Sequence, residues 1–228
     1  MTSAGQRFAA PSEPFKRHFN TALGGWFAYH GRRFPWRSTR NPYRVLVAEM
    51  LLRKTRAGDV VRVYRSITTR YPSLASMASA DTRELANVIA PVGLPGRAVA
   101  MRNAARKVLT VHRARMPASR QALQALPGVG VYIANAVLCF AFGMRVPLVD
   151  SGVGRVLLRS VLCESKRERL TCADGVLWGV AERLLPRRGA RLHNMALLDL
   201  AAGVCRPVRP LCGECPIRNV CRSKASVM

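Results

Sequence analysis

Acidic side chains are scarce in this chain of 228 residues, which has 12 Asp and Glu against 37 Lys and Arg. The formal net charge is therefore +25, and the basic residues are spread from Arg32 to Arg222 rather than gathered in a tail. A compact protein with such self-repulsion is normally paired with a polyanion. The alternative is that the basic side chains only keep the surface of a helical protein solvated and bind no polyanion. We expect a nucleic acid rather than an anionic membrane, because the sequence has no basic amphipathic anchor or lipidation motif.

Long apolar runs are also missing. None reaches the roughly 18 residues that a membrane span needs, and the first thirty residues hold no secretory hydrophobic segment. Hydrophobic residues nevertheless make up 49% of the chain, which is enough to bury a core and excludes wholesale disorder. We therefore expect an intracellular protein of the cytoplasm or nucleoid, without a membrane-bound part and monomeric.

Alternation of apolar and polar residues, which marks half-buried strands, is scarce too. Helical spacing and helix punctuation dominate, so we predict an all-α fold of nine or ten helices with short connections. A first helix should end at Gly31, and residues 1–15 should form a loose arm. The later helices are expected at about 43–54, 58–70, 82–90, 96–112, 119–126, 131–142, 151–163, 173–185 and 190–203.

The seven cysteines fall into two groups. Cys139, Cys163 and Cys172 lie singly in apolar or helical stretches and are expected to be buried small hydrophobes. The other four lie within seventeen residues, with spacings that suit metal ligation better than the disulfide framework of a small secreted domain. From chemistry alone, four thiolates select zinc or an iron–sulfur cluster about equally well. These ligand candidates are Cys205, Cys212, Cys215 and Cys221.

A Pro- and Gly-containing turn, Leu126-Pro-Gly-Val-Gly130, joins two predicted helices. Such a turn brings the backbone close to a partner and aims amide N–H groups outward at the start of the next helix. Phosphate suits this arrangement, and an ordinary turn between helices is the alternative. The candidate phosphate-binding residues are Leu126, Gly128, Val129 and Gly130.

Asp150 ends the apolar run Val-Pro-Leu-Val-Asp and directly precedes a predicted helix. A carboxylate in this place is suited to a task that needs charge. The alternative is that Asp150 only caps the helix.

The hairpin and the aspartate, at this spacing, resemble the superfamily of DNA glycosylases named for a helix-hairpin-helix, a Gly/Pro-rich loop and a catalytic aspartate. The cysteine pattern resembles the endonuclease III branch, and FPWRSTRNPYRVLVAEMLLRKTRAG is most similar to thymine/guanine mismatch glycosylases, with adenine-mismatch glycosylases next. The resemblance covers Phe19 to Cys221. It implies two helical subdomains that flank a DNA-binding cleft. One comprises 16–38 and 145–221, with the cluster loop at 205–221, and the other comprises 39–144, with the helix-hairpin-helix at 119–142; residues 222–228 are a tail.

The resemblance also implies a chemistry. Asp150 would stabilise the developing oxocarbenium sugar and activate water, Glu49 would contact or protonate the departing base, and Tyr132 would line the pocket. Bifunctional relatives have a lysine nucleophile where this chain has Tyr132, and no lysine occurs between Lys107 and Lys166, so no lyase activity at abasic sites is expected. For Glu49, a helix-surface carboxylate is the alternative.

The implied cofactor is a [4Fe-4S] cluster on the four clustered cysteines, with a monovalent cation at the hairpin as a further expectation. The implied partner is double-stranded DNA with a mismatched or damaged base, which must be flipped out of the stack. Arg53 lies at the family's intercalating position, and Leu94 and Pro95 would wedge from the other side.

The predicted function is hydrolytic excision of thymine or uracil opposite guanine in base excision repair. Excision of a mispaired adenine or of a damaged base is the alternative within the enzyme class, and a non-catalytic helix-hairpin-helix DNA-binding protein is the alternative outside it. One departure bears on activity: the family loop reads Asp-x-Asn or Asp-x-His, whereas this chain has Gly152. Loss of that side chain is expected to reduce activity or alter substrate choice.

Overall fold

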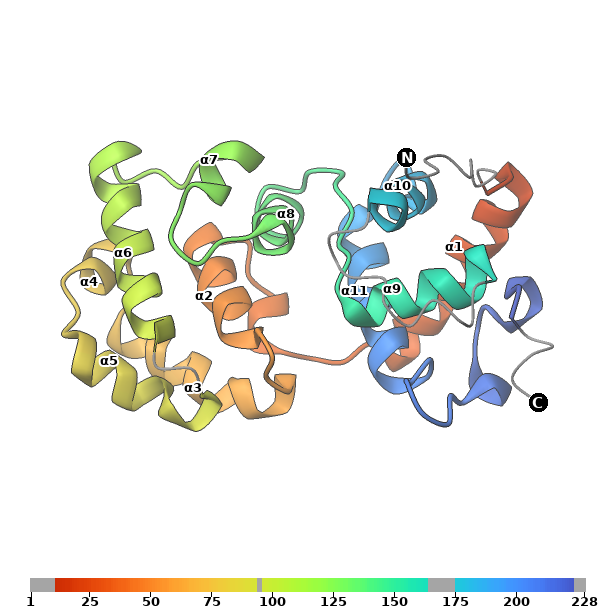
Figure 1. Ribbon diagram of the computed structural model, residues 1–228, viewed down its shortest axis with the longest axis horizontal. Coiled ribbons are helices and arrows are strands. Elements are labelled where there is room, and N and C mark those ends of the chain that lie inside the picture. Colours follow the sequence, from red (N-terminus) through yellow and green to blue (C-terminus); the bar gives the residue numbers. More distant parts are fainter. Residues whose placement is uncertain (1–10, 94–95, 164–174, 224–228) are drawn as a thin grey trace, which may run out of the picture. The chain divides into compact units, whose positions relative to one another are not determined.

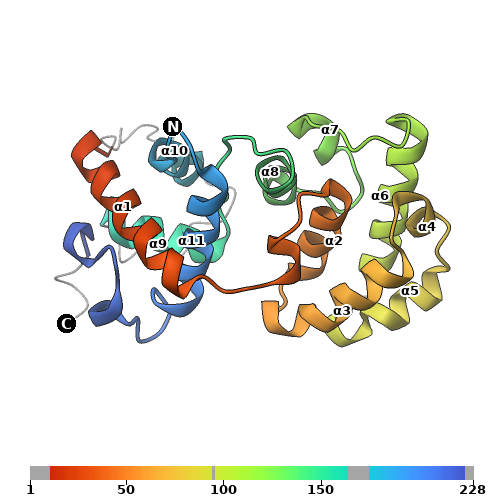
Figure 2. The same cartoon turned by 180° about the vertical axis from the view of Figure 1, so that it is seen from behind.

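The computed structural model describes residues 11–93, 96–163 and 175–223. Within these ranges the protein contains helices and loops but no strand (Figures 1 and 2), which confirms the predicted all-α class. The chain divides into two units. Unit 1 comprises Met1–Arg32 and Arg145–Met228, and unit 2 comprises Arg33–Met144. No helix among the described residues is both long and apolar enough to cross a membrane.

Unit 2 is built around α6 and α8. Its elements are η1 (Pro35–Arg37), α2 (Pro42–Leu52), α3 (Ala57–Arg70), α4 (Leu74–Ala78), α5 (Thr82–Ile89), η2 (Ala90–Val92), α6 (Gly96–Val111), α7 (Arg120–Gln124) and α8 (Val131–Phe140). Helices α4 and α5 pack on α6, and α2 packs on α8 and α3 (Figure 2). Every residue from Ile133 to Phe140 is buried, because the α8 sequence is apolar on nearly every side.

The start of unit 2 differs from the predicted boundary after residue 38. The segment from Arg33 belongs to unit 2 because Trp36 is buried there, with its ring 5.3 Å from that of Tyr64 in an edge-on contact. Phe34 stacks on Trp36 at 4.9 Å. An aromatic cluster that anchors a short 3₁₀ turn leaves no helical periodicity in the sequence, so the boundary could not be predicted from it.

Unit 1 packs its helices around one apolar core. The elements are α1 (Glu13–His30), α9 (Ser151–Leu157), the π-helical turn η3 (Leu158–Leu162), α10 (Gly175–Leu184), α11 (Ala190–Gly203), η4 (Cys212–Glu214) and η5 (Arg218–Val220). Helix α11 contacts both α1 and α9. Phe19, Leu157, Leu184 and Leu200 are fully or almost fully buried in this core.

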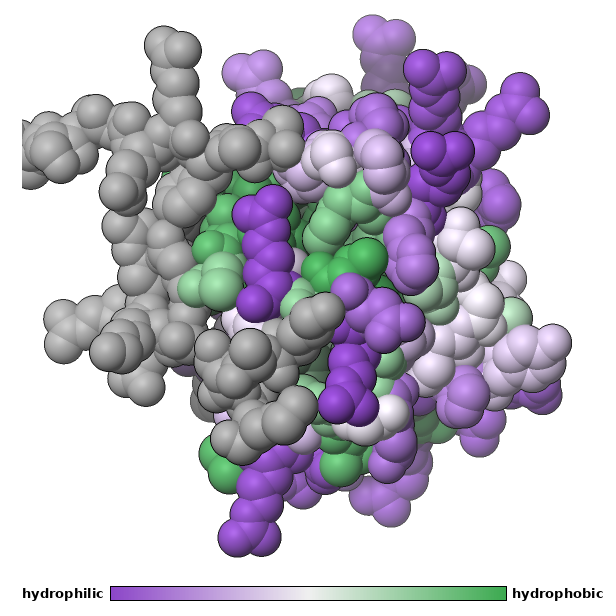
Figure 3. All heavy atoms as spheres, turned by 90° about the vertical axis from the view of Figure 1, so that its right-hand side faces the viewer, coloured by the Kyte–Doolittle hydropathy of each residue, from purple (hydrophilic) through white to green (hydrophobic). Residues whose placement is uncertain are grey.

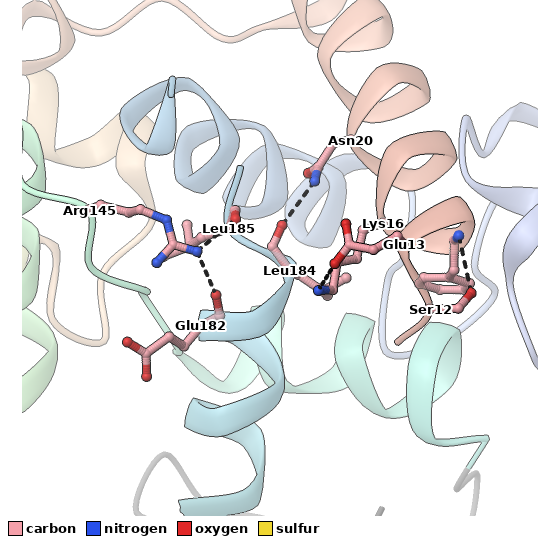
Figure 4. A network of polar contacts seen from close by, with 9 residues as sticks. Ser12, Glu13, Lys16, Asn20, Arg145, Glu182, Leu184 and Leu185 are labelled. Carbon is pink, nitrogen blue, oxygen red and sulfur yellow. Dashed lines mark hydrogen bonds and ion pairs between the residues drawn. The ribbon is translucent and has the colours of Figure 1, made fainter. Parts of the chain in front are cut away.

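Side chains from distant segments donate hydrogen bonds to the backbone carbonyls at the C-terminal end of α10 (Figure 4). The guanidinium of Arg145 donates hydrogen bonds to the carbonyls of Glu182, Leu185 and Pro186 at 2.9–3.2 Å. The amide of Asn20, on α1, donates to the Leu184 carbonyl at 2.9 Å. Carbonyls at a helix end have no partner within the helix, so these bonds fix α10 to α1 and to the segment that leads to Asp150.

The three cysteines outside the C-terminal group, all predicted to be buried, differ in their exposure. Cys139 is fully buried, as predicted, and Cys172 lies outside the described residues. The prediction for Cys163 is wrong, because this residue is exposed at the end of η3 in a left-handed conformation (φ 56°). The π-helical turn ends the predicted helix at this point, and the turn exposes the last residue of an otherwise apolar stretch.

Candidate functional site

The hairpin between α7 and α8 presents backbone rather than side chains. Leu126 and Val129 are only 2% and 5% exposed, so their side chains belong to the core of unit 2. The Val129 N–H donates to the Leu126 carbonyl at 3.1 Å and closes the turn. Gly130 is the N-cap of α8. The amide N–H groups of the first turn of α8 are therefore available to an anion at a positive helix end.

The two hairpin glycines have different reasons to be glycine. Gly128 has φ +78°, and a Cβ there would lie 3.0 Å from both Ala100 Cβ and Met50 Cε. Only glycine therefore fits position 128 without movement of its neighbours. Gly130 has φ −89°, and a Cβ there would meet nothing within 4 Å. The packing of the described residues does not require a glycine at position 130. Glycine suits the N-cap of α8, and close approach by another molecule is a second reason for a glycine there.

Arg53 is brought to the hairpin, as its predicted role in DNA binding requires. It is the exposed C-cap residue of α2, and its Nη1 lies 3.5 Å from the Gly128 carbonyl oxygen, a long contact. Lys54 follows in a left-handed conformation (φ 53°) and reverses the chain direction. Leu94 and Pro95, the second predicted wedge, lie outside the described residues.

Glu49 and Tyr132 lie on the two helices of unit 2 that pack together. Glu49, on α2, is 5% exposed and is surrounded by buried residues on both sides in the sequence. It is therefore not the helix-surface carboxylate that the sequence left open. Tyr132, half-buried, is the second residue of α8 and directly follows the hairpin. A buried carboxylate in an apolar helix is costly unless it is bonded or has a functional task.

Asp150, in unit 1, is the N-cap of α9. Its Oδ1 accepts a hydrogen bond from the Val153 N–H at 2.6 Å, so the capping interpretation is confirmed. The second oxygen, Oδ2, makes no hydrogen bond within the described parts of the chain, and the residue is half-buried. One oxygen thus fixes the carboxylate while the other is available to a reacting group. Capping and a charge task are compatible here.

Gly152 lies directly beside this carboxylate. A Cβ at position 152 would be 3.2 Å from Asp150 Oδ1 and 3.1 Å from Ala201 Cβ, on α11. Both distances are tighter than ordinary van der Waals contact, so any side chain at 152 would press on the carboxylate or on α11. Gly152 therefore allows α9 to approach α11 with the carboxylate in its observed position.

All four clustered cysteines line one cavity, formed by the last turn of α9, η3 and the segment 204–223. Burial, and to a smaller extent the charge of the neighbouring cysteines, raises the pKa of the Cys215 thiol to about 11. Burial also raises the pKa of Cys221. A metal that binds here must displace the thiol protons, and its charge then offsets the repulsion among thiolates.

Arg159, on η3, holds the first cysteine of this group. Its Nη1 donates to the Arg206 carbonyl at 2.8 Å and lies 3.6 Å from the sulfur of Cys205. Its carbonyl oxygen lies 3.7 Å from the sulfur of Cys221. Within residues 11–93, 96–163 and 175–223, no three His, Cys, Asp or Glu side chains converge closely enough to hold a single metal ion. The four cysteines therefore line a cavity and do not converge on the position of a single ion.

The face of unit 1 that carries the C-terminal segment is largely hydrophilic, with a central apolar area crossed by polar side chains (Figure 3). The loop between the first two clustered cysteines is exposed at Arg206, Val208 and Arg209. Its two arginines, Arg206 and Arg209, are therefore accessible to an anion.

One further residue, not singled out from the sequence, lies against the turn that follows α2. Arg97, on α6, is buried and only 6% exposed. It lies on the helix face shared by Met101, Ala104 and Val108, all of them buried. A basic residue on an apolar stripe was a visible signal of a special role, since arginine is seldom buried without one.

Comparisons with known proteins agree with this geometry. The family model of the HhH-GPD superfamily of base excision DNA repair proteins matches residues 47–194. A thymine-DNA glycosylase of Aeropyrum pernix is 38% identical over 200 residues, 86% of this chain and 89% of that protein. The adenine DNA glycosylase of Homo sapiens is 34% identical over 218 residues, 92% of this chain and 40% of that protein. The solved structure of a thermostable thymine-DNA glycosylase, 34% identical, superposes with a TM-score of 0.85 over 92% of this chain and 96% of that one.

Proposed function

Because this chain belongs to the HhH-GPD superfamily of base excision DNA repair proteins, we propose that it is a monofunctional DNA glycosylase that excises thymine or uracil mispaired with guanine. Its similarity to a thymine-DNA glycosylase over 89% of that protein's length carries the proposal. The substrate is double-stranded DNA, the protein acts as a monomer, and it works on the DNA of the cytoplasm or nucleoid.

Binding begins at the DNA backbone. The hairpin amides at Gly128 and Gly130, together with those of the first turn of α8, hold a phosphate at the positive end of that helix, while the excess of basic residues supplies affinity independent of sequence. A base inside a duplex is out of reach, so the nucleotide is flipped out, at a cost of a few kcal/mol that a mismatch reduces. Arg53 fills the vacated place in the stack, with Leu94 and Pro95 as the opposing wedge.

Cleavage of the glycosidic bond leaves positive charge on the sugar. The Oδ2 atom of Asp150, which has no partner within the described residues, stabilises this charge and orients water, while Oδ1 remains fixed by the Val153 N–H. Glu49 contacts or protonates the departing base, and Tyr132 lines the base pocket. Tyr132 cannot form a Schiff base, so the abasic strand is left intact.

The four clustered cysteines hold a [4Fe-4S] cluster in this proposal. The fit rests on four thiols that line one cavity. Zinc would require all four sulfurs at about 2.3 Å from a single centre, whereas a cluster distributes its ligands over separate irons. Cys205, Cys212, Cys215 and Cys221 would hold the cluster, and their bonds to it would cross-link the segment 205–221 and fix the exposed arginines of its first loop.

A second candidate function is excision of a mispaired adenine. The similarity to human adenine DNA glycosylase, which covers 92% of this chain, favours it. A panel of duplexes that carry T·G, U·G, A·G and a damaged base, treated with alkali after incubation, distinguishes the candidates. Release of thymine or uracil supports the proposal, and release of adenine alone selects the second candidate. Binding without release from any duplex points to a non-catalytic DNA-binding protein.

A further inference from the structure

Arg97 is a buried cation without an anion. Its side chain extends from the first turn of α6 into the core of unit 2 and is 6% exposed. The described residues place no carboxylate within ion-pair distance of it. Removal of a guanidinium from water is expensive unless strong hydrogen bonds replace the lost hydration. The fold retains Arg97 at this cost, so its bonds must serve a specific purpose.

The bonds of Arg97 connect two segments of the chain. Nη2 donates to the Arg53 carbonyl at 2.7 Å, and Nη1 donates to the Leu51 carbonyl at 2.9 Å. Nη1 also lies 3.4 Å from the carbonyl of Val92, which ends η2. One planar guanidinium therefore holds the end of α2, the turn after it and the end of η2 together.

A second link joins the same segments. The hydroxyl of Thr55 lies 3.1 Å from the Arg53 carbonyl and 3.2 Å from the Val92 carbonyl. Between these anchors, Lys54 adopts φ 53°, a left-handed conformation that a lysine adopts only when its surroundings enforce it. The turn 53–55 is thus held in a strained shape by Arg97 and Thr55.

Arg97 is connected to the backbone of Arg53 rather than to its side chain. The nearby charge of Arg53 and, to a greater extent, burial lower the pKa of Arg97, so electrostatics alone would keep these two arginines apart. Their closest connection is through the Arg53 backbone carbonyl, which leaves the Arg53 side chain free to extend toward the hairpin. Arg97 thus fixes the backbone from which the Arg53 side chain projects.

We propose that Arg97 is a positioning residue for base flipping: it preorganises the backbone of the turn that carries Arg53, so that this turn needs no further ordering when the Arg53 side chain occupies the vacated stack. The inference rests on the proposed function, since it assigns Arg97 to the flipping step of that reaction. A preorganised backbone stabilises the flipped state because only the Arg53 side chain, and not the turn that carries it, loses conformational entropy on insertion. The effect should therefore appear in flipping and base release rather than in general DNA affinity.

The test compares Arg97→Lys with Arg106→Lys. Arg106 is a matched control because it lies on the same helix and its Nε donates to the Ala78 carbonyl at 2.9 Å, at the end of α4 and away from the turn 53–55. We expect Arg97→Lys to slow single-turnover base release by about ten- to hundredfold, the range spanned by one charge-assisted hydrogen bond. The fluorescence of a 2-aminopurine beside the target base should fall in parallel. Affinity for a fully matched duplex should change less than about threefold.

A double-mutant cycle separates positioning from a merely structural role. In an Arg53→Ala background, Arg97→Lys should cause little further loss, because the side chain that it positions is gone. An undiminished loss in that background, or an equal loss in Arg106→Lys, would overturn the inference. Base release by Arg97→Gln is measured in the same way, and each variant is assayed at a temperature below the midpoint of its own thermal unfolding. If both Arg97 variants fail to fold, Arg97 is a folding residue and the inference is wrong.

The same assays distinguish failure of the inference from failure of the proposed function. If the wild type releases no base from any duplex, the proposed function fails, and the 2-aminopurine signal alone then decides the role of Arg97. If the wild type is active and Arg97→Lys matches it in both base release and fluorescence, the proposed function stands and the inference fails.

Discussion

Replacement of Gly128 by alanine tests whether the hairpin backbone is fixed by its packing. At φ +78°, an alanine costs about 1–2 kcal/mol relative to glycine. The new Cβ would lie 3.0 Å from Ala100 Cβ, which moves only with α6, and 3.0 Å from the more flexible Met50 Cε. Overpacking of this kind costs about 1–3 kcal/mol. We therefore expect Gly128→Ala to lower the free energy of unfolding by roughly 2–5 kcal/mol, as measured by urea denaturation.

Gly130→Ala is the matched control for this prediction. The new Cβ would meet nothing within 4 Å, and φ is −89°, so stability should fall by less than about 1 kcal/mol, mainly through the poorer N-cap. Affinity for DNA should nevertheless fall for matched and mismatched duplexes alike, because phosphate contacts carry no base information. Equal destabilisation by the two substitutions would refute the packing argument. Unchanged DNA affinity in Gly130→Ala would refute the close approach of a phosphate.

Three further predictions concern the chemistry. Borohydride should trap no covalent protein–DNA adduct, because Tyr132 replaces the lysine nucleophile; efficient trapping would show that another amine attacks the sugar. Purified protein should be brown and contain iron and sulfide, and a colourless protein with one bound zinc would contradict the cluster. Gly152→Ala should slow single-turnover base release without weakening DNA binding, since its Cβ would press on Asp150 Oδ1 at 3.2 Å, and Ala201→Gly should partly restore the rate by removing the contact at 3.1 Å. An unaffected rate in Gly152→Ala would show that the carboxylate needs no such clearance.

The sequence was sufficient for the elements with strong periodicity or clear punctuation. The apolar run 131–142 correctly indicated a buried helix, and Gly31 does follow the last residue of α1. The sequence missed α4, which has five residues and begins with a capping box made by Ser73 and Ser76. A helix this short is stabilised by its cap and by packing on α6, neither of which gives a periodic signal.

The candidate site was harder to predict from the sequence, because the type of a residue does not determine whether its side chain points into the core or toward a ligand. Leu126 and Val129 were predicted as DNA contacts, but their side chains are buried and only their backbone remains available. The two glycines of the hairpin look equivalent in the sequence, although only Gly128 is constrained by φ and by its neighbours. Arg97 belongs to the site only because α6 places it between two turns that are 39 residues apart, Arg53 and Val92.

The most direct test of catalysis by Asp150 is single-turnover base release by Asp150→Asn on a T·G duplex. Asparagine is as good an N-cap as aspartate, so the bond from the Val153 N–H and the start of α9 should persist while the charge is lost. Asp81→Asn is the matched control, since Asp81 caps α5 through the N–H groups of Arg83 and Glu84 at 2.8 and 2.9 Å. We predict that the rate of base release falls by several orders of magnitude in Asp150→Asn, whereas Asp81→Asn stays active. Asp150→Asn should bind mismatched DNA as well as or better than the wild type. Full base release by Asp150→Asn would show that this aspartate is only a helix cap and would contradict the proposed mechanism.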